Sequence, residues 1–141
     1  MKRKMLLALV LCLCSCGGGG GGGGSDSAFL GGVYTGAVEL FDRNCPSVPT
    51  QTNGYANWTV NQDSERIVVD TPQGGHAEGQ PTGEDSFKAT SQWQDGDCLD
   101  EATFVVNGIT DTSAFGIFTA SVTCGGVNCW TVFRGDLSRT H

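Results

Sequence analysis

The strongest constraint on the fold is the alternation of apolar and polar residues that runs from Gly31 to the end of the chain. A period of two places successive side chains on opposite faces of a β-strand, and no window here has the 3.6-residue period of an amphipathic helix. We therefore expect an all-β domain. The expected strands are Val33–Phe41, Tyr55–Asn61, Arg66–Thr71, Gly75–Gln80, Asp85–Trp93, Ala102–Asn107, Ser113–Cys124 and Cys129–Arg139.

Clusters of Gly, Asn, Asp and Pro separate these segments and predict turns. Asn107-Gly108 is the strongest hairpin signal, because both residues tolerate the positive φ of a type I′ turn. Without a helix for parallel crossovers, about eight strands predict an antiparallel up-and-down meander that closes into a small barrel without exposed edges. A β-sandwich is the alternative. In layout, the predicted domain resembles the calycin-like barrels of small envelope lipoproteins.

The first sixteen residues predict export. Lys2-Arg3-Lys4 precedes the apolar run Met5–Cys14, which is too short to cross a bilayer, since that takes roughly 20 residues. The next motif, Leu13-Cys14-Ser15-Cys16, resembles the lipobox of bacterial lipoproteins. This resemblance implies cleavage after Ser15, thioether lipidation of Cys16 and acylation of the new amino terminus with a fatty acid such as palmitate. It places the protein on a bacterial envelope membrane, and Gly17 after the cysteine implies the outer one.

The chain therefore divides into three parts. Residues 1–15 are the expected signal peptide, residues 16–27 a lipidated cysteine with a glycine-rich tether, and residues 28–141 a single barrel domain. The run Gly17–Gly24 followed by Ser25-Asp26-Ser27 predicts a flexible spacer.

Charge narrows the possible partners. After residue 15 the chain carries five basic and fifteen acidic side chains. A domain with this balance is repelled by phosphate backbones, so we expect no nucleic-acid partner. The expected membrane contact is the lipid on Cys16 alone.

Four cysteines remain in the predicted domain: Cys45, Cys98, Cys124 and Cys129. An oxidising envelope compartment favours two disulfides, for which three pairings are possible. Cys124 and Cys129 flank the expected four-residue loop Gly125–Asn128. We therefore expect a Cys124–Cys129 bridge and, by remainder, Cys45–Cys98. Zinc binding is the rival interpretation, but no Cys-x-x-Cys pair is present.

The sequence shows little catalytic machinery. Its two histidines, His76 and His141, lie outside any catalytic motif, and we expect neither a catalytic residue nor a cofactor. A hydrolase that uses two carboxylates is the remaining enzymatic alternative.

Around the Gly96 turn lie four carboxylates that suit a hard cation such as Ca²⁺: Asp95, Asp97, Asp100 and Glu101. They lack the spacing of an EF-hand, so we interpret them as a solvated hairpin tip and expect no metal.

Aromatic residues are the candidate ligand or partner surface. Trp58, Trp93 and Trp130 are either core or a binding platform at the mouth of the barrel. In Ser113–Cys124 both faces are apolar, so either Phe115 and Ile117 or the opposite face must point outward. A capping loop over Asp42–Gly54 is one way to cover such a patch.

These features predict an envelope lipoprotein whose barrel is a non-catalytic binding or interaction domain, for a small molecule or a protein. By analogy with small lipid-anchored barrels, an inhibitor of a lysozyme or secreted protease is the second alternative, since an acidic surface steers basic partners. The ligand or partner itself is not specified by the sequence.

Overall fold

The alternating segments form eight antiparallel strands in a computed structural model that describes residues 28–45 and 52–141. The strands are β1 (Gly32–Arg43), β2 (Asn53–Asp63), β3 (Arg66–Asp70), β4 (His76–Gly83), β5 (Ser86–Asp95), β6 (Cys98–Asn107), β7 (Ser113–Cys124) and β8 (Val127–Thr140). Each predicted strand is present. The largest difference is the start of β6, which lies four residues earlier than predicted because the turn before it needs only two residues. β4 ends three residues later than predicted, and the other bounds agree within two residues.

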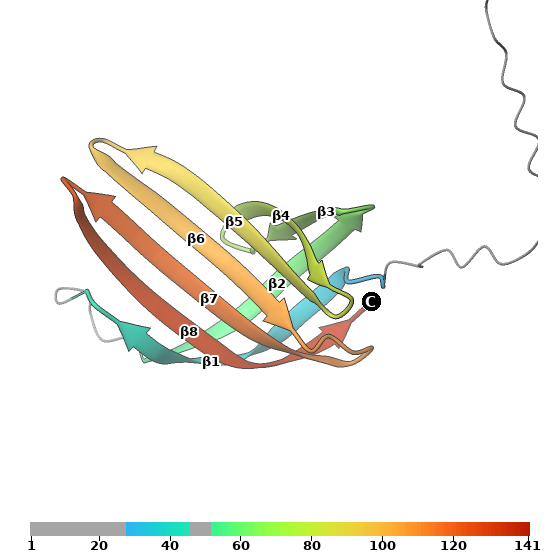
Figure 1. The fold of residues 1–141 in the computed structure, drawn as a ribbon. Coiled ribbons are helices and arrows are strands. Elements are labelled where there is room, and N and C mark those ends of the chain that lie inside the picture. Colours follow the sequence, from blue (N-terminus) through green and yellow to red (C-terminus); the bar gives the residue numbers. More distant parts are fainter. Residues whose placement is uncertain (1–27, 46–51) are drawn as a thin grey trace, which may run out of the picture.

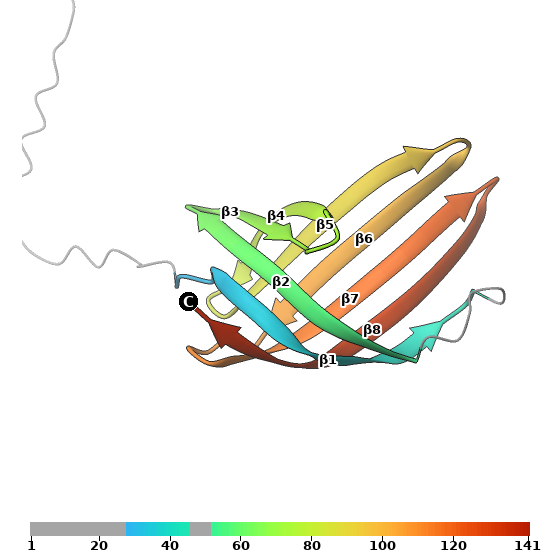
Figure 2. The same ribbon diagram turned by 180° about the vertical axis from the view of Figure 1, so that it is seen from behind.

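The strands form a closed barrel (Figures 1 and 2). Each strand pairs with the next, and β8 returns to pair with β1 from Val33↔Thr140 to Arg43↔Thr131. This confirms the predicted closed meander and excludes the sandwich. Residues 28–45 and 52–141 contain no helix with the length and apolar character needed to cross a membrane.

Two hairpin turns differ from their predictions. Gly125 and Gly126 both have positive φ, at 57° and 82°, and alone connect Cys124 to its partner Val127 as a type I′ turn would. Between β6 and β7 the predicted hairpin is present, but the type I′ turn at Asn107-Gly108 is wrong. Asn107 ends β6, and residues 108–112 form the connection, because Thr110 pairs with Ser113 through its backbone and its hydroxyl.

One end of the barrel is closed by the segment before β1. Leu30 is 2% exposed, and its carbonyl accepts a hydrogen bond from the Tyr34 hydroxyl. The buried guanidinium of Arg139 donates to the carbonyls of Phe29, Gly31 and Thr110 at 2.7–3.2 Å. Carbonyl dipoles thus take the place of a carboxylate partner for this buried charge. Burial also raises the pKa of Tyr34, against the opposing effect of the Arg139 charge.

The barrel has two halves. We call the part that contains residues 28–31 and the inner side chains of Tyr34, Ile67, Phe87, Val106 and Leu137 the closed half. These side chains are at most 2% exposed, and Tyr34 packs edge-on against Phe87 with ring centroids 6.0 Å apart. The open half is the part beyond Trp58 and Phe104. β3 and β4 have 5 and 8 residues against 12 and 14 for β7 and β8, so the wall is low on their side (Figure 1).

Both disulfides lie at the open end, and the predicted pairing is wrong. The bridges are Cys98–Cys124, with Cα atoms 4.3 Å apart, and Cys45–Cys129, with Cα atoms 4.9 Å apart. The two-residue turn is the reason. It places Val127, not Cys129, opposite Cys124 on β8, while Cys98 lies directly opposite Cys124 on β6.

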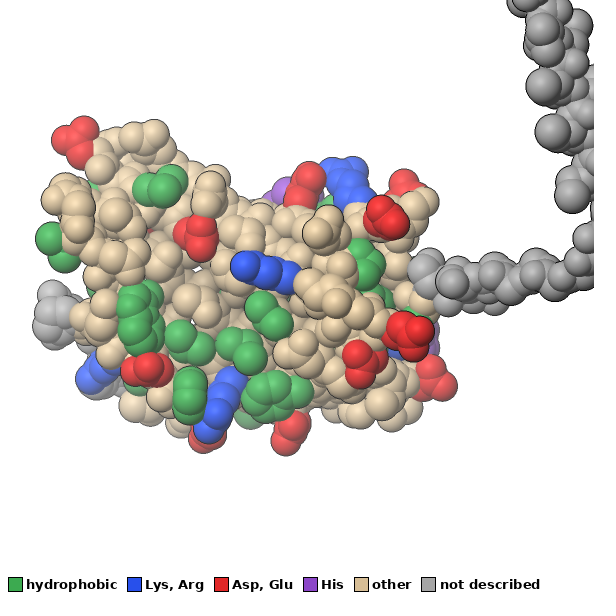
Figure 3. All heavy atoms as spheres, viewed as in Figure 1, with side chains coloured by type: hydrophobic (Ala, Val, Ile, Leu, Met, Phe, Trp, Pro, Cys, Tyr) green, Lys and Arg blue, Asp and Glu red, His purple; other side chains and the backbone are tan. Residues whose placement is uncertain are grey.

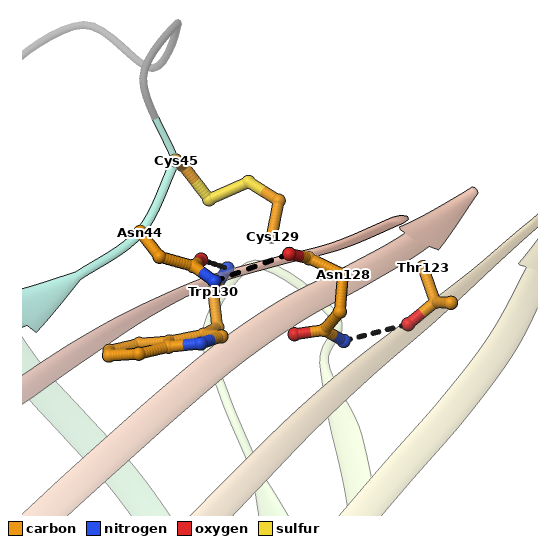
Figure 4. Close-up of a disulfide and its surroundings, with 6 residues drawn as sticks. All are labelled: Asn44, Cys45, Thr123, Asn128, Cys129 and Trp130. Atoms are coloured by element: carbon orange, nitrogen blue, oxygen red, sulfur yellow. Dashed lines mark hydrogen bonds between the residues drawn. A yellow bond between two sulfur atoms is a disulfide. The ribbon is translucent and has the colours of Figure 1, made fainter. Parts of the chain in front are cut away.

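The Cys45–Cys129 bridge extends the pairing of β1 with β8 (Figure 4). Asn44 donates its backbone N–H to the Trp130 carbonyl, while its side-chain oxygen accepts the Trp130 N–H at 2.6 Å. The Asn44 amide also donates to the Asn128 carbonyl. The side chain of Asn44 therefore supplies an acceptor that the backbone would otherwise provide, and it holds the two cysteines opposite each other.

Several predictions fall outside the described residues. The signal peptide over residues 1–15, the lipidation site Cys16 and the tether over residues 16–27 all do, and so do residues 46–51 of the predicted capping loop. The ends of that loop are strand, since β1 extends to Arg43 and β2 begins at Asn53.

Candidate functional site

The open half contains a cavity of about 430 Å³. Its lining comes from β1, β2, β4, β5, β6, β7 and β8 and from the turn between β3 and β4. Aromatic side chains dominate the lining, and the polar groups lie mainly at the low wall, in the turn around Gln73. Its volume lies within the range of ligand-binding pockets.

Small inner side chains create this space. On the inner face, Ser91 of β5 lies opposite Ala102 of β6, which in turn lies opposite Ala120 of β7. Gly54 and Ala56 occupy the inner positions of β2 at the same end. In the closed half Phe87 of β5 lies opposite Val106 of β6, and the Leu137 side chain covers Gly116 of β7, so larger side chains fill the interior. The difference in side-chain volume along the strands leaves one half hollow.

A row of three phenylalanines forms one wall of the cavity. Phe104 lies opposite Phe118, which lies opposite Phe133, so β6, β7 and β8 each contribute one ring. The Phe104 and Phe118 centroids are 5.0 Å apart, and Trp58 packs edge-on against Phe104 at 5.2 Å. These contacts hold the rings in place, so the aromatic wall is preformed.

The rim of the cavity exposes a tryptophan. Trp93 of β5 lines the cavity and yet is 52% exposed. It lies directly opposite Asp100 of β6, which lies opposite Val122 of β7. Asp100 shares the inner face with Ala102 and is half-buried. A large apolar side chain and a carboxylate thus adjoin each other at the open end.

An ionic cluster lies on the low wall. His76 lines the mouth, and its two ring nitrogens contact Asp70 at 2.7 Å and Glu78 at 3.3 Å. Arg66 contacts the same Glu78 oxygen at 2.6 Å. Hydrogen bonds to Asp70 and Glu78 raise the pKa of His76 above its usual 6.5, and hydrogen bonds from Arg66 and His76 lower the pKa of Glu78. This cluster joins β3 to β4 beside the cavity.

The predicted aromatic site is divided between two faces. The cavity contains Trp58 and Trp93, whereas Trp130 lies on the outer face, opposite Ser121. Phe115, 36% exposed, and Ile117 also point outward, because Ala114 and Gly116 take the inner positions of β7. The sequence alone did not determine which face of this strand points outward. In the barrel it is the face that carries Phe115 and Ile117.

The outward residues belong to an outer patch. We use this term for Val105, Phe115, Ile117, Trp130 and Val132, of which Val105 and Ile117 are opposite each other. Figure 3 views this face and shows apolar side chains grouped over it, with basic side chains among them. Arg134 lies opposite Ile117 and stacks on the Phe41 ring at 3.7 Å.

The candidate calcium ligands are not gathered into a site. Asp100 and Glu101 are consecutive in β6, so they point to opposite faces of the sheet. Glu101 accepts a hydrogen bond from Gln92 on the outer face, while Asp95 and Asp97 lie at the exposed turn. Within residues 28–45 and 52–141, no group of three or more His, Cys, Asp or Glu side chains is placed to hold a metal ion.

Carboxylate chemistry has no buried centre in the described part of the chain. There the only buried charged side chain is Arg139, so no described Asp or Glu pair is buried together. Arg139 is bonded to backbone carbonyls at the closed end.

Sequence reasoning missed Phe104, Phe118 and Phe133 as site residues. A signal for them exists in the Gly125-Gly126 dipeptide, which favours a two-residue turn. That turn fixes the register of β7 on β8 and places Phe118 opposite Phe133.

No family model, curated protein or solved structure matches this chain.

Proposed function

We propose that this chain is an envelope lipoprotein whose barrel binds a small, mainly apolar molecule in its open half without transforming it. The observation that carries the proposal is the cavity of about 430 Å³ with its preformed aromatic wall. An unfilled space lined by Trp58, Phe104, Phe118 and Phe133 costs stability, because side chains around a void lose packing contacts. A ligand that fills the space recovers those contacts.

The size of the cavity limits the size of the ligand. With about 30 Å³ for each water-sized group, the volume corresponds to about fourteen non-hydrogen atoms. Polar groups at Thr71, Gln73 and Ser91 lie on the lining and suit a ligand with one polar end. A small amphiphile or a single aromatic ring system with a substituent fits this description.

The first described residue and the mouth of the cavity lie at opposite ends of the barrel. Ala28, the first described residue, precedes β1 at the closed end, whereas the β5–β6 and β7–β8 turns, beside which the disulfides lie, are at the open end (Figure 1). A lipid on Cys16 would connect to Ala28 through the eleven residues Gly17–Ser27, which span about 38 Å when stretched. In this arrangement the ligand enters from the aqueous side and not directly from the anchoring membrane.

The experiment for binding is a titration with the fluorescent probe 1-aminonaphthalene, which is uncharged at neutral pH and small enough for the cavity. The full chain carries Cys16→Ser so that no detergent competes with the probe. We expect a saturable rise in probe fluorescence and at least a tenfold weaker affinity in Ala102→Phe, which fills the cavity between Ser91 and Ala120. The matched control is Thr103→Phe, the next residue, which points outward. If the Ala102→Phe variant binds the probe as tightly as the protein without this substitution, the probe binds elsewhere.

The experiment for the anchor is separate. Membrane fractionation of the native chain and of Cys16→Ser should show the native chain with the membrane and the variant in the soluble fraction. Membrane association that survives Cys16→Ser would contradict the lipid anchor and leave the binding proposal untouched.

A further inference from the structure

We propose that the ligand carries a positive charge, an amine or quaternary ammonium group, that binds between the Trp93 indole and the Asp100 carboxylate at the rim of the cavity. The inference rests on the proposed binding function and adds the chemical class of the ligand. It follows from the geometry of the rim, the unengaged carboxylate and the distribution of charge around the mouth.

The geometry places both groups on the inner face. Trp93 and Asp100 are directly opposite each other in the pairing of β5 with β6. Trp93 follows the buried inner residues Phe87 and Ala89 along β5, and Asp100 precedes the inner residue Ala102 along β6. A group held between the two side chains would therefore lie at the end of the cavity, with the rest of the ligand extending toward Phe104.

The chemistry of the pair favours a cation. The face of an indole ring attracts a cation more strongly than other aromatic rings do, and a neighbouring carboxylate adds a direct charge interaction. Asp100 is half-buried, and its carboxylate makes no hydrogen bond or ion pair with any described residue. Asp95, the next inner position of β5, adds a second negative charge. Apolar walls around such groups strengthen their field toward an approaching cation.

Basic groups near the mouth do not offset this field. His76 and Arg66 are already bonded to Asp70 and Glu78 on the outer face of the low wall. Among the described residues, Arg43 alone is a basic side chain that the register places on the inner face of the open half, through its pairing with Thr131. It lies three strands from Asp100, roughly 14 Å along the sheet. Arg43 is therefore farther from a cation at Trp93 than Asp100 is, and His76, which lines the same cavity, is already paired with Asp70 and Glu78.

The test compares three decyl compounds below their micellar concentrations: decyltrimethylammonium, 1-decanol and decyl sulfate. Binding to the Cys16→Ser full chain is measured by titration calorimetry and tryptophan fluorescence. We expect the cation to bind about tenfold more tightly than the alcohol, since cation–π and charge interactions at a partly exposed site together give about this factor. Decyl sulfate should bind most weakly.

Two isosteric variants locate the charge effect. Asp100→Asn should remove most of the preference for the cation over the alcohol while leaving 1-decanol binding unchanged. Asp97→Asn, which makes the same charge change in the exposed turn, should keep the preference. The inference is overturned if the alcohol binds as tightly as the cation or if both variants behave alike. It is also overturned if decyl sulfate binds most tightly, which would indicate that Arg43 binds the charged group. If none of the three compounds binds, the proposed binding function itself fails.

Discussion

The two halves of the barrel are built from the same strands but are stabilised differently. In the closed half, Tyr34, Phe87 and Val106 are completely buried. The guanidinium of Arg139 donates hydrogen bonds to backbone carbonyls of residues 29–31. In the open half the interior is hollow, and two disulfides join neighbouring strands. One half is thus held by packing and the other by covalent bonds, which leaves the hollow half free to hold a ligand.

The largest expected effect comes from the long disulfide of the open half. Replacing Cys45 and Cys129 together by Ala should lower the free energy of unfolding by about 4.5 kcal/mol, because the bridge closes the longer loop. The corresponding change at Cys98 and Cys124 should cost about 3.5 kcal/mol. Urea unfolding measures both values. Non-reducing peptide mapping is the check on pairing, and a Cys124–Cys129 peptide would contradict it.

The second prediction compares one substitution in both halves. Phe87→Ala in the closed half should cost about 4 kcal/mol, because it opens a cavity in a filled core. Phe118→Ala should cost only about 1.5 kcal/mol, because that ring already borders empty space. Thermal or urea unfolding of the two variants tests the difference. Equal losses would mean that the open half is as tightly packed as the closed half.

The third prediction adds volume instead of removing it. Ala89 is 1% exposed and faces Phe104, so Ala89→Phe should overpack the closed half and cost about 3 kcal/mol. Ala102→Phe places the same ring in the cavity and should change the free energy of unfolding by less than about 1 kcal/mol. The pair is compared by urea unfolding without ligand. A strongly destabilised Ala102→Phe would show that the space is not available.

The smallest expected effect concerns pH and the low wall. Asp70 and Glu78 raise the pKa of His76 above 6.5, so the folded state favours the protonated ring. The contribution to stability is complete below pH 6.5 and is lost as the pH rises through the pKa of the folded state. An NMR titration of His76 in folded and urea-unfolded protein measures both pKa values. His76→Gln should remove this part of the pH dependence, and identical pKa values in the two states would contradict the prediction.

The sequence predicts the wall of the barrel better than its interior. Alternation identifies all eight strands and their antiparallel order, because burial of one face is a local property of each strand. The residues of the turns predict turn length and strand register less well. Asn107-Gly108 predicts the hairpin but not its five-residue connection, and the two-residue turn at Gly125-Gly126 sets a register that changes both disulfide partners.

The cavity has no local signal because it depends on residues from several strands. Ser91, Ala102 and Ala120 become neighbours only through two separate registers. In β7 both faces are apolar, so alternation alone does not say whether Phe115 or Phe118 points inward. Closure of the barrel determines both which residues meet at the cavity and which face of β7 points inward. No single strand specifies this closure.

The two disulfides also determine what a single cut would do to the chain. The Cys98–Cys124 loop lies entirely within the span from Cys45 to Cys129, so one bridge is nested inside the other. A protease that cleaves once anywhere between Cys45 and Cys129 would leave both fragments covalently joined. A nick in the hairpins at the open end would therefore release no piece of the protein.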